Sequence, residues 1–135
     1  MRDYARLQTA ILLRRLAYQL NRTDRNGDAE SIHDLRVAIR RLGLCLRVFA
    51  PFFPEGSWKK VRHQLAELMQ AAGRVRDRDI ALRLLAEAGV PPRAAIATRL
   101  AGERRKAGRD LLLEIRRWKG RSFSQKWRSR LELSA

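Results

Sequence analysis

The sequence predicts an all-α fold: an antiparallel four-helix bundle with a short C-terminal helix. Apolar residues recur every three or four positions in four long segments, and Gly, Pro, Asn and Asp separate these segments. No segment alternates apolar and polar residues for long enough to predict a β-strand. Because only short loops join the segments, an antiparallel bundle is the most economical arrangement.

The first two helices are predicted from their apolar spacing and the turns that follow them. Residues from about 4 to 21 carry apolar side chains at helical intervals, and the segment Asn26-Gly27-Asp28 ends this helix. The second helix begins at Ser31, a good N-cap residue, and continues to Phe49. Its apolar positions step by 3, 4, 3, 4 and 3, which is the clearest helical pattern in the chain.

The remaining helices follow two proline-containing turns. The third starts after Ser57, another N-cap candidate, and runs to about residue 85. The fourth covers about residues 92–118, and a short helix follows Gly120. We expect a single domain over residues 1–135, with fraying from about residue 129.

Composition restricts the possible partners. The chain has 30 Lys and Arg against 14 Asp and Glu, which gives a formal net charge of +16. Of the basic residues 25 are Arg, and the guanidinium group binds phosphate oxygens in a bidentate fashion. No apolar run approaches the roughly 20 residues of a membrane span, and the N-terminus lacks a signal-peptide pattern, so we expect a cytoplasmic protein. With one Cys and two His, neither a metal site nor a cofactor is expected.

The second predicted helix carries a one-sided basic stripe. His33, Arg36, Arg40 and Arg47 lie at offsets of 0, 3, 7 and 14, and Arg41 lies one step round the helix. Like charges at such spacing repel by roughly 0.2–0.5 kcal/mol per pair, and no acid follows Asp34 in this helix to offset them. The stripe is therefore a candidate anion-binding surface, in which His33 would donate a hydrogen bond. The alternative is a solvated arginine face.

The third predicted helix contains alternating charges in residues 72–80. Asp77 and Asp79 resemble a catalytic carboxylate pair, but residues i and i+2 point to different faces of a helix. We expect these acids to pair with arginines and fix their orientation instead. Gly73 is costly inside a helix, so we expect it to mark the close approach of a neighbouring helix. On the fourth helix, Arg105 and Arg109 share a face that is either a binding surface or a solvated one.

Two motifs resemble those of a known family. Residues 33–42, His-Asp-Leu-Arg-Val-Ala-Ile-Arg-Arg-Leu, are similar to the H-x-x-R-V-x-x-R-R-L signature of the conserved-histidine α-helical domain, CHAD. Residues 73–80, Gly-Arg-Val-Arg-Asp-Arg-Asp-Ile, resemble its second signature, G-x-x-R-D-x-D-V/I. The resemblance implies an all-helical, non-catalytic module that binds inorganic polyphosphate through a basic surface.

The resemblance also implies roles for individual residues. The following fall on the basic positions of the family motifs: His33, Arg36, Arg40, Arg41 and Arg76. Asp77 and Asp79 occupy its acidic positions. The family commonly has a further Arg where this chain has Gly43, and Arg47 would partly substitute for it.

The chain resembles only the first of the two four-helix halves of a usual CHAD. It is therefore either part of a longer CHAD or one member of a homodimer that rebuilds the complete groove, and we favour the homodimer. Three functions follow in order of preference: a polyphosphate-binding module associated with polyphosphate granules, a nucleic-acid-binding helical protein, and an enzyme of phosphate metabolism or its accessory subunit. A single-stranded nucleic-acid binder would more often expose aromatic residues in its groove, and aromatics make up only 7% here.

Overall fold

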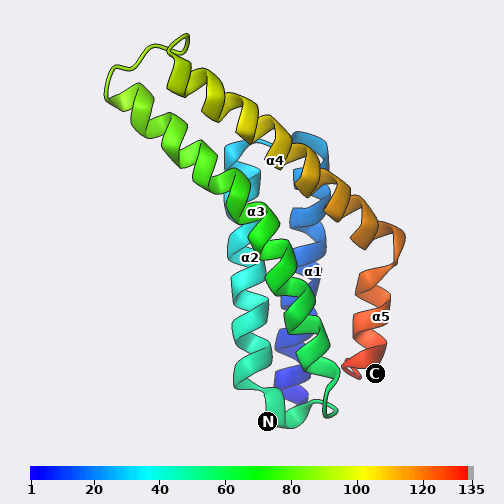
Figure 1. Cartoon of the computed structure of the whole chain (residues 1–135). Helices are drawn as coiled ribbons and strands as arrows, with labels where there is room; N and C mark the ends of the chain where they lie inside the picture. The colour runs from blue at the N-terminus through cyan, green and yellow to red at the C-terminus, as the bar shows by residue number, and fades with distance from the viewer. Residues whose placement is uncertain (134–135) are drawn as a thin grey trace.

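The structure is a computed structural model that describes residues 1–133, and every regular element in this range is helical (Figure 1). The elements are α1 (Arg2–Asn26), α2 (Ala29–Val48), the single 3₁₀ turn η1 (Ala50–Phe52), α3 (Ser57–Glu87), α4 (Ala95–Gly120) and α5 (Phe123–Arg130). The all-α prediction is confirmed, including the short C-terminal helix.

Four antiparallel helices surround one hydrophobic core. Consecutive helices pack side by side, α4 returns to contact α1, and α5 lies against α1 (Figure 1). Each of the four long helices contributes fully buried side chains to this core, such as Leu16, Leu35, Leu68 and Ile115. Burying a Leu or Ile side chain stabilises a fold by about 1.5–3 kcal/mol, so the core holds the helical surfaces in fixed positions.

The α3–α4 hairpin extends beyond the other helices. With 31 residues, α3 is about 16 Å longer than the 20-residue α2 at 1.5 Å per residue. No residue between Val75 and Ala107 belongs to the core, although Ala97 is buried against the hairpin itself. Residues 76–106 therefore form a two-helix arm that projects past the α1–α2 turn (Figure 1). The four-helix packing is confined to the remainder of α3 and α4.

The turn between α1 and α2 differs in detail from the sequence prediction. The helix α1 continues to Asn26 and ends at Gly27, whose φ of 61° is the left-handed conformation that glycine adopts at low cost. The N-cap of α2 is Asp28 instead of Ser31, because the Asp28 carboxylate accepts a hydrogen bond from the Ser31 amide at 3.0 Å. The Ser31 hydroxyl donates in turn to the Asp28 carbonyl at 2.9 Å. These bonds start α2 two residues earlier than predicted.

The segment from residue 129 to 133 is packed onto the bundle. Leu131 is only 1% exposed and belongs to the core, and Glu132 forms an ion pair with Arg6 at 3.2 Å. The buried side chain of Leu131 thus attaches this segment to the bundle. Ser134 and Ala135 lie outside the described residues.

Candidate functional site

The basic stripe predicted on the second helix lies along α2. We define the α2 stripe as His33, Arg36, Arg40 and Arg47. His33, Arg40 and Arg47 are exposed, and Arg36 is half-buried at the edge of the core. Within the stripe, Arg36 borders the apolar seam of α2, whereas the other three residues face solvent.

Arg36 and Arg76 are half-buried residues of two helices that pack against each other, α2 and α3. Arg36 lies four residues after the buried Ile32, and Arg76 lies four residues after the buried Ala72. The Nε atom of Arg36 is inaccessible to solvent and has no hydrogen-bond acceptor within the described chain. A buried donor without an acceptor costs about 1–3 kcal/mol.

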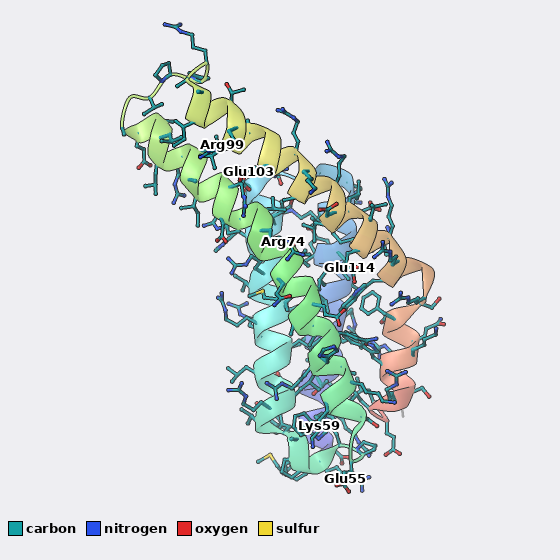
Figure 2. All side chains as sticks on the ribbon, viewed as in Figure 1. Glu55, Lys59, Arg74, Arg99, Glu103 and Glu114 are labelled. Atoms are coloured by element: carbon teal, nitrogen blue, oxygen red, sulfur yellow. The ribbon has the colours of Figure 1, made fainter. Side chains whose placement is uncertain are left out.

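Ion pairing divides the basic residues into two groups. Within the described range, no Asp or Glu lies within 4.0 Å of the charged atoms of the eight residues predicted to bind phosphate: His33, Arg36, Arg40, Arg41, Arg47, Arg76, Arg105 and Arg109. Other arginines are neutralised locally. On the arm, for example, Glu103 forms ion pairs with Arg78 at 3.3 Å and with Arg99 at 3.9 Å. Figure 2 shows Arg99 and Glu103 on neighbouring turns of α4.

The acid nearest to the stripe in sequence, Asp34, is already paired. Its carboxylate accepts a hydrogen bond from Arg22 of α1, and Glu30 lies 3.7 Å from the same guanidinium. The bond to Asp34 raises the pKa of Arg22. Asp34 therefore fastens α2 to α1 and leaves the arginines of the stripe without a neutralising partner.

The eight predicted residues do not form one surface. Arg41 lines a groove of about 500 Å³ between α1 and α2, together with Arg14 and Arg15. Arg105 and Arg109 line a separate cleft of about 500 Å³ between α4 and the end of α1, which also includes Arg25. The prediction omitted Arg14, Arg15 and Arg25, which appear in the first helix as basic residues off its apolar seam.

Asp79 has a structural partner on α4. Its Oδ1 atom accepts a hydrogen bond from Nε of Arg104 at 3.0 Å, and Nη2 of Arg104 donates to the Gly27 carbonyl at 2.8 Å. This chain of contacts connects α3, α4 and the α1–α2 turn, where the arm leaves the bundle. Asp77 is exposed, and no basic group of the described residues lies within ion-pair distance of it. The two carboxylates thus have different environments.

Gly73 does not mark a close approach between helices, contrary to the sequence prediction. A Cβ atom built on Gly73 would have no heavy atom of a neighbouring element within 4 Å. The same holds for Gly43 on α2. Both positions have room for a side chain, so steric crowding does not explain either glycine.

His33 lies further inside its helix than the sequence indicated. Because α2 begins at Ala29, His33 is in the second turn, past the unpaired amides of the N-terminus. An anion at His33 would therefore be bound by side chains of the stripe and not by the end of the helix. The described residues contain no group of three or more His, Cys, Asp or Glu that could hold a metal ion.

These observations define an all-helical module with an arginine surface that its own acids leave unpaired. The chain belongs to the CHAD domain family, whose family model matches residues 8–135. Neither a curated protein nor a solved structure matches the chain significantly. Within the described residues, no helix is both long and apolar enough to cross a membrane.

Proposed function

We propose that this chain is a non-catalytic module that binds inorganic polyphosphate through the α2 stripe and Arg76. The observation that carries this proposal is that no acid among residues 1–133 forms an ion pair with these residues, although acids neutralise arginines on the arm and at the α1–α2 contact. Polyphosphate carries about one negative charge per phosphate, so successive phosphates can each take a guanidinium along one helix face. Membership of the CHAD family supports the same ligand.

The distribution of aromatic side chains favours polyphosphate over single-stranded nucleic acid. Trp118, Phe123 and Trp127 are buried and pack on one another with ring centroids 5.0–5.3 Å apart. The two tyrosines are exposed, but both are in α1 and not on the stripe. A single-stranded nucleic-acid groove gains about 1–3 kcal/mol per stacked base, and the stripe offers no aromatic residue for such stacking.

A competition titration separates polyphosphate from nucleic acid. Labelled polyphosphate bound to the chain is titrated with duplex DNA, duplex RNA or unlabelled polyphosphate at equal phosphate concentration. We expect unlabelled polyphosphate to displace the label at a concentration at least tenfold lower than either duplex does. Equal displacement by a duplex would instead favour the nucleic-acid-binding alternative, since phosphate contacts dominate such affinity.

We propose that the chain has no activity toward polyphosphate. The unpaired groups of the α2 stripe are guanidinium and imidazole groups, which bind anions, and Asp79 is engaged by Arg104. Incubating the purified chain with polyphosphate and Mg²⁺ should release no phosphate above the rate without protein. Steady release that the stripe variants abolish would support the enzyme alternative.

If the chain binds polyphosphate without hydrolysing it, we expect it at cytoplasmic polyphosphate granules. Co-localisation of a fluorescent fusion with stained granules would test this expectation.

We further propose that two copies pair when they bind polyphosphate. One copy presents the stripe on one wall, and a usual CHAD surrounds its ligand with two halves. A polyanion between two basic walls would also offset the repulsion between chains of net charge +16. Sedimentation at micromolar concentration with polyphosphate should show a species of twice the 15.6 kDa chain mass. A 15.6 kDa chain that remains single at every ligand ratio would contradict this proposal.

A further inference from the structure

The α1–α2 hairpin has a second apolar face, directed away from the core. On α1, Ile11 and Tyr18 are spaced by seven residues and share one side of the helix. On α2, Val37 and Ala38 line the same cavity as Ile11 and Tyr18. We call this cavity between the two helices the outer groove.

The outer groove is both hollow and exposed. Ile11, Leu12, Val37 and Ala38 line its cavity of about 500 Å³. Tyr18, which also lines the groove, is 60% exposed. Scattered apolar residues are normal on protein surfaces, but a contiguous apolar patch marks an interaction site.

The rim of the groove is basic. Arg14, Arg15 and Arg41 line it, and none of them is paired with an acid of the described chain. Its single acidic lining residue, Asp34, is engaged by Arg22. The groove therefore combines an apolar floor with three free guanidinium groups.

We propose that the outer groove binds an amphipathic helix of a partner protein, with Asp or Glu on both sides of its apolar stripe. A helix lays its apolar face into such a concave surface, and its flanking acids would reach the arginines of the rim. A second copy of this chain fits less well, since symmetric pairing would bring Arg14, Arg15 and Arg41 of both copies together. The pairing of copies proposed above uses a different face. A membrane surface is flat and would leave the cavity between the helices unfilled.

The test uses a designed helical peptide of about 18 residues, with Leu at positions i, i+3, i+4 and i+7 and Glu beside them. A second peptide of identical composition distributes the same Leu residues around the helix. Binding of each labelled peptide to the full chain is measured by fluorescence anisotropy. We expect the amphipathic peptide to bind at least tenfold more tightly than the redistributed one.

Two double variants locate the site. Ile11→Gln/Tyr18→Gln removes two apolar side chains that line the groove from α1 and should weaken binding of the amphipathic peptide at least tenfold. Leu84→Gln/Ile96→Gln is the matched control, since these arm residues are 55% and 46% exposed, and it should leave peptide affinity unchanged. Both variants should retain wild-type affinity for polyphosphate, because none of the four residues lies on the α2 stripe.

Each contrary result has a defined meaning. Equal affinity for the two peptides would show that charge alone attracts them and would overturn the proposal. So would an equal loss of peptide binding in both double variants. Binding to phosphatidylglycerol vesicles that requires Ile11 and Tyr18, with no binding of the amphipathic peptide, would assign the groove to a membrane surface. Self-association that Ile11→Gln/Tyr18→Gln abolishes would assign it to a second copy.

Discussion

Replacing Arg36 and Arg40 together by Ala tests the role of the α2 stripe. A charge-assisted hydrogen bond from a half-buried guanidinium contributes about 2 kcal/mol, and one from an exposed guanidinium about 1 kcal/mol. Arg36 is half-buried and Arg40 is exposed, so the double variant should lose about 3 kcal/mol of binding free energy. At 1.4 kcal/mol per factor of ten, the affinity for polyphosphate should fall about 100-fold.

The fold should tolerate this change. Neither arginine is paired with an acid of the described residues, so its removal leaves no carboxylate without a partner. Ala is also the best helix former, and helicity by circular dichroism should remain at the wild-type level. The arm provides a matched control in Arg83→Ala/Arg99→Ala, which removes the same two charges from exposed residues paired with Glu87 and Glu103.

The assay is a titration of labelled polyphosphate at physiological ionic strength, followed by fluorescence anisotropy. The control variant should lose less than threefold in affinity, because screening over about 8 Å weakens distant charges. An equal loss in the two double variants would show that net charge attracts the ligand. An unchanged affinity in the Arg36 and Arg40 variant would place the site outside the stripe.

Three further substitutions test other parts of the structure. Asp24→Asn should destabilise the fold by about 1 kcal/mol at pH 7, because Lys119 donates a 2.8 Å hydrogen bond to this carboxylate and lowers its pKa. The stabilisation by Asp24 is present above the ordinary pKa of an Asp carboxyl and is lost as pH falls through the lowered pKa. In urea denaturation, the difference in unfolding free energy between Asp24→Asn and wild type should therefore be smaller at acidic pH than at pH 7. A difference of the same size at both pH values would refute the link to the Asp24 pKa. Gly43→Arg should tighten polyphosphate binding about fivefold by adding a guanidinium to the stripe, whereas Gly43→Ala should leave the affinity unchanged. Equal affinities of these two variants would exclude a phosphate contact at position 43. Gly73→Ala should raise the free energy of unfolding by about 1 kcal/mol, because Ala favours a helix and its Cβ atom would meet no neighbouring residue. A lower free energy of unfolding in the same urea assay would show that a side chain at position 73 is not accommodated.

The sequence predicted the helices well because apolar periodicity determines which side of each helix is buried. The pattern from Ile32 to Phe49 was clear because nearly all of α2 packs on the core. The arm was not predictable in the same way, since Leu82 and Leu85 continue the apolar pattern of α3 into a region where α1 and α2 have ended. Periodicity reports that a face is apolar but not which helix covers it.

The candidate site was predictable in part for a similar reason. Positions along a single helix, such as Arg36 and Arg40, follow directly from the helical period. Relations between helices do not, and therefore the sequence did not predict that Arg105 of α4 lines a cleft with Arg25 of α1. The hydrogen bond between Asp79 and Arg104 joins residues 25 positions apart. The sequence contained no signal that Asp79 would pair with Arg104 and not with another arginine.

Assigned NMR resonances of the arginine Nε–Hε groups, followed during titration with tripolyphosphate, test the central claim most directly. The proposed site predicts that the largest shifts occur at Arg36, Arg40, Arg47 and Arg76, with protection of the buried Arg36 Nε–Hε group from exchange. Saturation should occur at the same ligand concentration for all four groups. Shifts confined to Arg105 and Arg109, or spread evenly over all exposed arginines, would contradict a phosphate site on the α2 stripe.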